Sequence, residues 1–239
     1  MSMDEDSSYW YLCLHRRHAS SGEFRGVFVI IGLVGFIGSG KGTVADLLVE
    51  HHGFVKESFA NSVKDSVAAV FGWHRELLEG ATPESRQWRE QKDEWWSNAL
   101  GREVTPRWVL QLMGTEAGRD VFHPDLWVHT VFRRIDWRPE SHYVIADVRF
   151  PNEIKAIQAR GGKVIQVTRG DLPWWYQKAE DHNRAGAHFQ WLVDNVHESE
   201  WAWVGSTVDY LLPNTEDIET LKERVDNMVG ILYNSYVTQ

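Results

Sequence analysis

The sequence of 239 residues has little cysteine, no long apolar run and a deficit of basic residues. Its single cysteine, Cys13, excludes an intramolecular disulfide framework and is typical of a protein from the reducing cytoplasm. No apolar run is long enough to span a membrane, and the acidic N-terminus lacks the basic region of a secretory signal. Lysine and arginine total 25 against 34 acidic residues, so the net charge of −9 argues against broad nucleic-acid binding. We therefore expect a cytoplasmic protein with no membrane association.

The remaining composition is that of an ordinary globular protein, except for an excess of tryptophan. The hydrophobic fraction is 43% and the charged fraction 25%, and the length is sufficient for one large core. The sequence contains 13 tryptophans, and a cluster of them lies within residues 174–203. We interpret a wider stretch, residues 170–206, as an irregular insertion with its own packing or binding role. Residues 1–25 are interpreted as an N-terminal extension outside the fold.

The segment 27–43 carries the most specific chemical pattern. An apolar run rich in valine and isoleucine passes into Gly35-Phe36-Ile37-Gly38-Ser39-Gly40-Lys41-Gly42-Thr43, and a helix-like stretch follows. A strand, a glycine-rich turn and a helix in this order indicate a phosphate-binding loop. Glycines let backbone N–H groups curve around a phosphate, Lys41 supplies a mobile cation, and the hydroxyl of Thr43 can hold Mg²⁺. The alternative is a glycine-rich turn with a surface lysine, which explains less of the pattern.

Strand-like and helix-like segments alternate along the rest of the chain. The expected strands are 27–34, 54–59, 143–148, 163–168 and 208–212. The expected helices are 42–52, 60–71, 85–100, 105–113, 124–135, 151–160 and 215–232. This alternation predicts a three-layer α/β fold with a parallel central sheet. In such sheets ligands bind beyond the carboxyl ends of the strands, so we expect the phosphate loop, Asp147 and Arg169 to converge there.

A second signal follows the buried strand-like sequence YVIA. Asp147 ends this segment, and a carboxylate beside a phosphate loop can hold Mg²⁺ through water or orient a nucleotide hydroxyl. Arg149 lies two residues on and can bind a phosphate with its forked guanidinium. The alternative is that Asp147 caps the next helix and that Arg149 pairs with a surface acid.

Cations and aromatic residues are scattered between these elements. Phosphoryl transfer between two polyanions requires several cations to offset charge at the transferring group. Arg107 is the strongest candidate, because it lies at a helix start, where a phosphate is favoured. The 11 histidines show no spacing that resembles a zinc site. The other candidate cations and aromatic residues are Lys64, Arg86, Arg89, Arg133, Arg134, Arg169, Trp108 and Trp127.

Taken together, these motifs resemble the phage deoxynucleoside monophosphate kinase family, within the P-loop nucleoside monophosphate kinase superfamily. The loop, with Gly42 and Thr43 after Lys41, is similar to that of adenylate kinase. The ordered set of motifs spans about residues 27–230 and is more specific than the loop alone. Its further members are Phe59-Ala60, Val63-Lys64-Asp65, Arg107, Gln111, Gly114-Thr115-Glu116, Asp125-Leu126-Trp127-Val128, Ile145-Ala146-Asp147-Val148-Arg149, Asn152-Glu153, Gly161-Gly162, Val167-Thr168-Arg169, His197, Ser199-Glu200 and residues 209–214.

The resemblance implies a P-loop kinase fold over residues 26–239, with a mostly parallel sheet and a helical acceptor-binding region at about 72–140. It implies Mg²⁺-assisted transfer of the γ-phosphoryl group of ATP to a deoxynucleoside 5′-monophosphate, which supplies phage DNA synthesis in the host cytoplasm. A homodimer is the usual default for the oligomeric state. The implied roles are catalysis by Lys41, Arg107, Asp147 and Arg149; ATP binding by Gly38, Ser39, Gly40, Lys41, Gly42, Thr43 and Arg169; acceptor binding by Lys64, Arg107, Trp127, Asp147 and Arg149; and Mg²⁺ binding by Thr43 and Asp147.

The resemblance leaves the tryptophan-rich stretch 172–205 unexplained, because this stretch matches no arginine-bearing lid of the adenylate kinase type. Two alternatives therefore stay open. One is a P-loop kinase with another acceptor, such as a modified base in DNA, dephospho-coenzyme A or another hydroxyl compound. The other is a nucleotide-binding module that is not a kinase, against which the acceptor-like set of Lys64, Arg107, Trp127 and Arg149 argues. The sequence does not indicate which base the acceptor carries.

Overall fold

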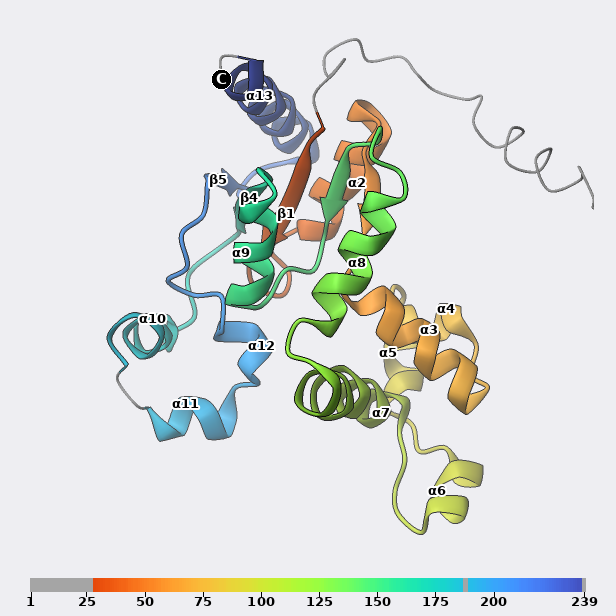
Figure 1. The fold of residues 1–239 in the computed structure, drawn as a ribbon. Helices are drawn as coiled ribbons and strands as arrows, with labels where there is room; N and C mark the ends of the chain where they lie inside the picture. The colour runs from red at the N-terminus through yellow and green to blue at the C-terminus, as the bar shows by residue number, and fades with distance from the viewer. Residues whose placement is uncertain (1–27, 187–188, 238–239) are drawn as a thin grey trace, which may run out of the picture.

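A computed structural model describes residues 28–186 and 189–237, and its centre is a five-stranded sheet in the order β2-β3-β1-β4-β5 (Figure 1). Every neighbouring pair of strands is parallel, which confirms the predicted α/β architecture with a parallel central sheet. The predicted extension at residues 1–25 lies outside the described residues. The strands are β1 (Ile30–Val34), β2 (Val55–Glu57), β3 (Tyr143–Ile145), β4 (Lys163–Thr168) and β5 (Tyr210–Pro213).

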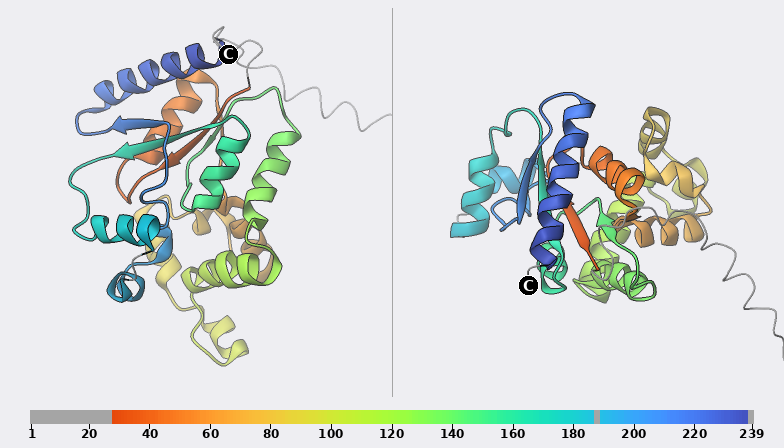
Figure 2. Two further views of the ribbon diagram at one scale, coloured as in Figure 1. Left: turned by 60° about the vertical axis from the view of Figure 1, so that its left-hand side comes forward. Right: turned by 90° about the horizontal axis from the view of Figure 1, so that it is seen from above.

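Helices fill the connections between the strands and cover both faces of the sheet (Figure 2). No described helix is both long enough and apolar enough to cross a lipid bilayer. The helices are α2 (Lys41–His52), α3 (Ala60–Phe71), α4 (Arg75–Glu79), α5 (Pro83–Glu90), α6 (Glu94–Leu100), α7 (Pro106–Leu112), the π-helix η3 (Met113–Phe122), α8 (Leu126–Asp136), α9 (Pro151–Ala159), α10 (Tyr176–Ala185), α11 (Gln190–Asn195), α12 (Glu198–Trp201) and α13 (Ile218–Val237).

The apolar run of β1 is continuous because both of its faces are covered. Successive side chains of a strand point to opposite faces. Ile31 and Leu33 accordingly join the core formed with α2 and α13, whereas Ile30 and Val34 join the core formed with α3, α8 and α9. Gly32 lets α9 approach closely, because a Cβ atom at this position would lie 2.5 Å from Cδ1 of Ile157. The strand that leads into the phosphate loop is therefore held from both sides.

The helix predicted over 85–100 is wrong, because two helices, α5 and α6, occupy this range. The side chain of Asp93 explains why a new helix begins after α5. One of its oxygens accepts from the backbone N–H of Trp96 at 2.9 Å and so caps α6, and the other accepts from Nε1 of Trp73 at 2.8 Å. An aspartate that competes for backbone N–H groups favours a helix start over a helix interior.

The irregular structure predicted for 170–206 is also wrong, because α10, α11 and α12 lie between β4 and β5. These helices are short, so their apolar residues show little periodicity in the sequence. Two tryptophans of this section pack in the core, whereas Trp174 is exposed. Trp201 and Trp203 are buried, and the ring of Phe36 in the phosphate loop lies 4.9 Å from that of Trp203 and 5.5 Å from that of Trp175. The section thus packs directly against the loop.

The helix predicted over 105–113 does not end before Gly114. Beyond α7 it continues as the π-helix η3 to Phe122. Gly118 in this segment provides space for a neighbouring side chain. A Cβ atom at Gly118 would lie 2.4 Å from the indole of Trp127, whose Nε1 donates to the carbonyl of Gly114 at 2.8 Å. Trp127 on α8 therefore holds η3 in position through a tertiary contact that local sequence patterns do not reveal.

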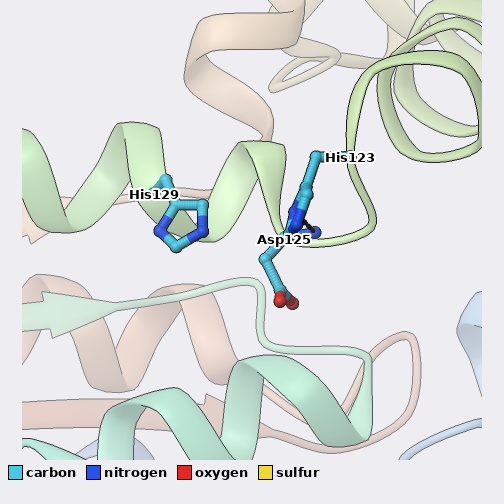
Figure 3. A group of neighbouring side chains, drawn as sticks. All are labelled: His123, Asp125 and His129. Atoms are coloured by element: carbon cyan, nitrogen blue, oxygen red, sulfur yellow. Dashed lines mark hydrogen bonds between the residues drawn. The ribbon is translucent and has the colours of Figure 1, made fainter.

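The turn from η3 into α8 groups three polar side chains, His123, Asp125 and His129 (Figure 3). His123 follows the end of η3, Asp125 is the N-cap residue of α8, and His129 lies one turn into α8. The spacing of these histidines does not resemble a zinc motif. They lie together because the helix begins between them, which places Asp125 and His129 on one face.

Candidate functional site

A cavity of about 1140 Å³ lies between the phosphate loop and the helices α3, α5 and α7. The sheet contributes the segments that follow β2 and β3, as expected at the carboxyl ends of parallel strands. Five residues predicted for the acceptor side all line this cavity, together with Gly38 and Gly42 of the loop. The five are Lys64, Arg107, Trp127, Asp147 and Arg149.

The phosphate loop is held in shape by glycine geometry and by a residue from the other end of the chain. Gly40 has φ of +96°, a left-handed conformation that lets it precede α2 as its N-cap residue. A Cβ atom there would lie 2.2 Å from Nδ2 of Asn214, which donates to the carbonyl of Ser39 at 2.9 Å. Asn214, just after β5, therefore fixes the loop at the start of α2.

Lys41 turns back over its own loop. Its Nζ donates to the carbonyl of Gly35 at 2.6 Å and to that of Phe36 at 3.0 Å. Burial lowers the pKa of Lys41 from 10.5 to about 8, and the positive charge of Arg149 adds to this effect. A lysine whose charged form is disfavoured gains more from a polyanion than an exposed lysine does.

Five of the residues predicted for ATP binding are not among those that line the main cavity, namely Ser39, Gly40, Lys41, Thr43 and Arg169. Ser39 and Arg169 line a separate hollow of about 20 Å³ on the other side of the loop, beside β4. The hydroxyl of Ser39 is buried and has no hydrogen-bond partner among the described residues. Thr43 is exposed in the first turn of α2. The structure therefore does not bring Arg169 together with Asp147 and Arg149 in one cavity, because β1 lies between β3 and β4 in the sheet.

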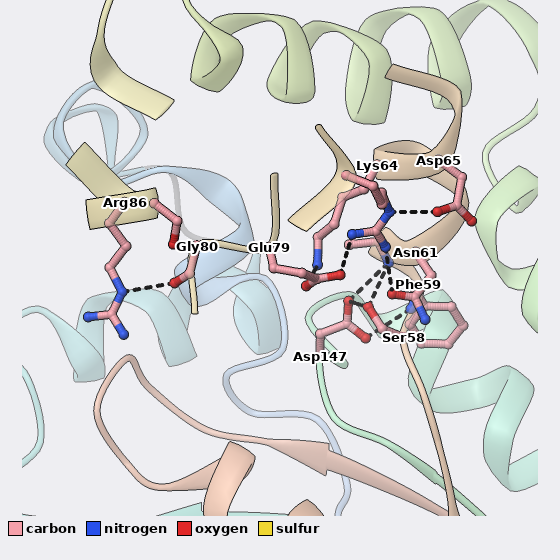
Figure 4. A network of polar contacts seen from close by, with 12 residues as sticks. Ser58, Phe59, Asn61, Lys64, Asp65, Glu79, Gly80, Arg86 and Asp147 are labelled. Atoms are coloured by element: carbon pink, nitrogen blue, oxygen red, sulfur yellow. Dashed lines mark hydrogen bonds and ion pairs between the residues drawn. The ribbon is translucent and has the colours of Figure 1, made fainter. Parts of the chain in front are cut away.

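Asp147 caps a helix, but this helix is α3 rather than α9, the next one in the chain (Figure 4). Its Oδ1 accepts from the N–H of Phe59 at 2.9 Å. Its Oδ2 accepts from the N–H of Ala60 at 3.0 Å and from Oγ of Ser58 at 2.7 Å. Three of about four lone-pair positions of the carboxylate are thereby used. One position remains on Oδ1, so the carboxylate has little capacity for direct ligation and fits a metal ion best through a bound water molecule.

Arg149 extends toward α12 and lines the cavity with about half of its side chain exposed. Its Nη1 donates to Oγ of Ser199 at 3.2 Å and lies 3.7 Å from Oε1 of Glu200. His197 supports this contact, because its Nδ1 lies 2.9 Å from the same Oγ. The pairing of Arg149 with an acid is therefore observed, but this acid lines the cavity and is not a distant surface group.

The far end of the cavity is rich in arginine. Arg86, Arg89 and Arg107 line it together, and Arg107 forms an ion pair with Glu90 at 2.8 Å. Nε of Arg89 is buried and has no hydrogen-bond partner among the described residues. Burial lowers the pKa of Arg89, and the charge of Arg107 adds to this effect. Since like charges have been brought together, this end of the cavity favours an anion.

Lys64 and Arg86 are each anchored beside this cluster. Lys64 pairs with Glu79 at 2.6 Å, and Nε of Arg86 donates to the carbonyl of Gly80 at 2.9 Å (Figure 4). The segment 79–80 at the end of α4 therefore orients cations that come from α3 and α5. Because the guanidinium of Arg86 is tied to the backbone, its charge has a fixed position at this arginine-rich end of the cavity.

Sequence reasoning missed the pair formed by Arg119 and Glu153. Nη2 of Arg119 donates to Oε1 of Glu153 at 2.7 Å, and its guanidinium stacks on the ring of Phe150 at 4.2 Å. Oε2 of Glu153 accepts from the backbone N–H groups of Arg149 and Phe150. Burial raises the pKa of Glu153 to about 6 despite its contact with Arg119. The only signal in the sequence was the motif Asn152-Glu153, which assigned no partner.

Comparison with known proteins gives two relatives. The chain is 33% identical to a deoxynucleotide monophosphate kinase of Acanthamoeba polyphaga mimivirus over a 152-position alignment that covers 59% of this chain and 74% of that protein. It is 27% identical to the deoxynucleoside-5′-monophosphate kinase of Escherichia phage T5, in an alignment that covers 52% of this chain and 70% of that protein. No protein-family model matches the chain.

Among solved structures, the chain is similar to a dephospho-CoA kinase from Campylobacter jejuni, with 12% identity and a TM-score of 0.41. The superposition covers 85% of this chain and 96% of that one. A shikimate kinase from Aquifex aeolicus, also 12% identical, has a TM-score of 0.40 and covers 88% of this chain and 100% of its own.

Proposed function

Because this chain belongs to the deoxynucleotide monophosphate kinase family, we propose that it transfers the γ-phosphoryl group of ATP to a deoxynucleoside 5′-monophosphate. The observation that carries this proposal is the single cavity that joins the phosphate loop to an arginine-rich end. Such a cavity accommodates two polyanions end to end. In a phage-encoded enzyme, the diphosphate product would supply precursors for phage DNA synthesis.

On the donor side, the backbone N–H groups of residues 38–43 bind the phosphates of ATP at the start of α2. Lys41 exchanges the carbonyls of Gly35 and Phe36 for the outer phosphates, which restores its full charge. Asn214 keeps the loop in register while this exchange occurs. Arg169 follows β4 behind the loop and contacts the nucleoside part of ATP.

Mg²⁺ would supply positive charge that neutralises the phosphates of the donor. Thr43 has an exposed hydroxyl in the first turn of α2 and fits as a ligand. Asp147 fits through a water molecule, because its carboxylate is largely occupied by the cap of α3. The main task of Asp147 is then to fix α3, and with it Lys64, against the cavity.

On the acceptor side, the phosphate of the monophosphate binds between Arg149 and the cluster of Arg89 and Arg107. The unpartnered Nε of Arg89 indicates that an anion completes this cluster. Lys64 adds a cation from α3. Trp127 on α8 packs against η3, and together they form the wall beside the base. Arg89 and Arg119 extend the acceptor set beyond the residues that the sequence predicted.

Transfer itself requires little covalent chemistry from the protein. The phosphate oxygen of the acceptor is already an adequate nucleophile, so positioning and charge neutralisation determine the rate. Arg149 lies close enough to Lys41 to lower its pKa, which supports a role for both cations beside the transferring group. Glu200 and Ser199 hold Arg149 on the other side and limit its orientations.

A panel of nucleoside monophosphates, with and without the 2′-hydroxyl, tests the proposal. ATP-dependent formation of a diphosphate is measured for each acceptor by chromatography. We expect turnover with at least one deoxynucleoside monophosphate and weaker turnover with its ribose counterpart. ATP hydrolysis that no monophosphate stimulates would contradict the proposed acceptor class, as would faster turnover with dephospho-coenzyme A or with DNA.

A further inference from the structure

The cluster of His123, Asp125 and His129 lies outside the nucleotide cavity, since none of the three lines it. Each residue offers one ligand atom, and these atoms lie within 4.8 Å of one another. Both histidines are exposed, and Asp125 is partly buried. Figure 3 shows the three side chains on the same side of the turn that joins η3 to α8.

Asp125 does not perform the usual task of an aspartate at its position. It is the N-cap residue of α8, but its side chain makes no hydrogen bond to the first turn of that helix. Its carboxylate points away from the helix (Figure 3), and Oδ1 accepts instead from Nδ2 of Asn152 on α9 at 2.7 Å. The contact with Asn152 fixes the orientation of the carboxylate and leaves Oδ2 available for another partner. A ligand carboxylate is commonly held in this way.

The two imidazoles are also accessible to a ligand. The imidazole of His129 makes no hydrogen bond within the part of the chain that the structure describes, and it lies 5.6 Å from the ring of His123. Nδ1 of His123 accepts from the backbone N–H of Asp125 at 3.0 Å. This bond is exposed to solvent, so the ring can exchange it for a bond to an ion. Arg119 approaches from η3, but its guanidinium is engaged with Glu153.

We propose that His123, Asp125 and His129 bind a divalent transition-metal ion, best matched by Zn²⁺, at a site separate from the nucleotide cavity. Two imidazoles and one carboxylate form a ligand set that Zn²⁺ accepts with water in the fourth position. Imidazole nitrogen suits zinc, nickel and copper, whereas Mg²⁺ prefers oxygen ligands. The ion is therefore distinct from the metal that assists phosphoryl transfer.

Binding requires only a small closure of the cluster. Ligand atoms around a tetrahedral Zn²⁺ lie about 3.3 Å apart, given metal–nitrogen bonds of about 2.0 Å. The exposed imidazoles can rotate inward about their side-chain bonds to reach this spacing, while Asn152 holds Asp125 in place. No backbone movement is needed, because Asp125 and His129 already share one face of α8.

An ion at this site would join three elements that form the wall of the cavity. His123 directly follows η3, which carries Thr115 and Arg119. Asp125 is the N-cap residue of α8, which carries His129 and Trp127. Through Asn152 the site also contacts α9. The ion would thus restrain η3 against α8 and stabilise the folded chain. Binding of the ion does not depend on the proposed kinase function.

Titration of the full-length, chelator-treated protein with ZnCl₂ in a calorimeter tests this proposal, with thermal unfolding as a second readout. We expect saturation at one equivalent for this site and a rise in the melting temperature. His129→Ala and Asp125→Asn should each weaken the binding of Zn²⁺ by about tenfold or more and abolish the thermal shift. Asn152→Ala should weaken binding without removing a ligand.

His51→Ala serves as a matched control, because His51 is an exposed histidine on α2, far from the cluster in sequence. This variant should bind Zn²⁺ like the unaltered chain. The metal-free variants are compared by circular dichroism, and the exposed position of His129 makes its replacement compatible with folding. Absence of Zn²⁺ binding by the unaltered chain would overturn the proposal. Unchanged affinity in both His129→Ala and Asp125→Asn would overturn it equally.

Discussion

Arg119 and Glu153 form an ion pair at the cavity wall, with 2.7 Å between Nη2 and Oε1, although only 2% of the Glu153 side chain is exposed. The same carboxylate accepts from the backbone N–H groups of Arg149 and Phe150. One buried residue thus connects the π-helix η3 to the loop after β3. Glu153 therefore holds η3, which carries Arg119, against the loop after β3, which carries Asp147 and Arg149.

The raised pKa of Glu153 predicts a specific dependence of stability on pH. The carboxyl titrates at 4.5 in the unfolded chain and at about 6 in the folded one, so the folded state binds the proton more tightly. This group therefore contributes stability below pH 4.5, and the contribution is lost as the pH rises to 6. We expect Glu153→Gln to remove up to about 2 kcal/mol of this pH dependence. Urea unfolding between pH 4.5 and 7 measures it.

Glu219→Gln, on the exposed side of α13, is the control for this experiment and should leave the pH profile unchanged. An unaltered slope in Glu153→Gln would show that the ion pair with Arg119 compensates fully for burial.

The lowered pKa of Lys41 predicts that ATP binding takes up a proton. Near pH 8 about half of the free protein carries a neutral Lys41, and phosphate oxygens favour the charged form. Calorimetry at pH 8 in buffers of different ionisation enthalpy should give an uptake of about half a proton. Affinity for ATP should fall as the pH rises above 8. Lys41→Met should lose the uptake, and an uptake that persists in this variant would assign the titration to another group.

Lys41→Ala should also reduce phosphoryl transfer by about 100-fold or more while the fold stays intact, because a fixed cation is lost at the transferring group. Turnover is measured at saturating ATP, and folding is followed by circular dichroism. Near-normal turnover would exclude the loop as the donor site.

Arg149→Ala should weaken use of the acceptor more than binding of ATP. The side chain extends from the loop after β3 into the cavity, toward α12, and its cation faces the space assigned to the acceptor phosphate. We expect KM for the monophosphate to rise by about tenfold or more, with a smaller change in the Kd for ATP. Arg133→Ala is the control, since this exposed arginine lies over Trp137 on α8. Equal losses for both substrates would contradict the acceptor role.

Arg89→Met should separate stability from function. The buried Nε of Arg89 has no partner in the described part of the chain, and Arg107 repels its charge. Methionine has a similar length and no charge, so this substitution should raise the free energy of unfolding by about 1 kcal/mol. The same change should raise KM for the acceptor, because an anion-binding group is lost. Arg138→Met, at an exposed position, should alter neither quantity. A destabilised Arg89→Met with normal KM would show that Arg89 is structural.

Local patterns predicted the elements around the phosphate loop well. β1, α2, α3 and β4 lie within a few residues of their expected limits, because apolar runs and terminal glycines are properties of short segments. The same patterns failed at 85–100 and 170–206, where short helices are defined by caps and by packing rather than by periodicity. The acceptor residues were predicted as a set, and all of them line one cavity. Their individual roles remain predictions.

The sequence by itself determined the parallel α/β architecture and the position of the loop that is predicted to bind phosphate, because each depends on residues that are neighbours in the chain. Only the tertiary structure decided which partners the functional side chains have. Asp147 caps a helix that begins 87 residues before it, and Glu153 contacts an arginine 34 residues away. The approach of His123 to His129 likewise depends on where α8 begins. Such contacts arise from packing between elements, and packing leaves little periodic trace in a single sequence.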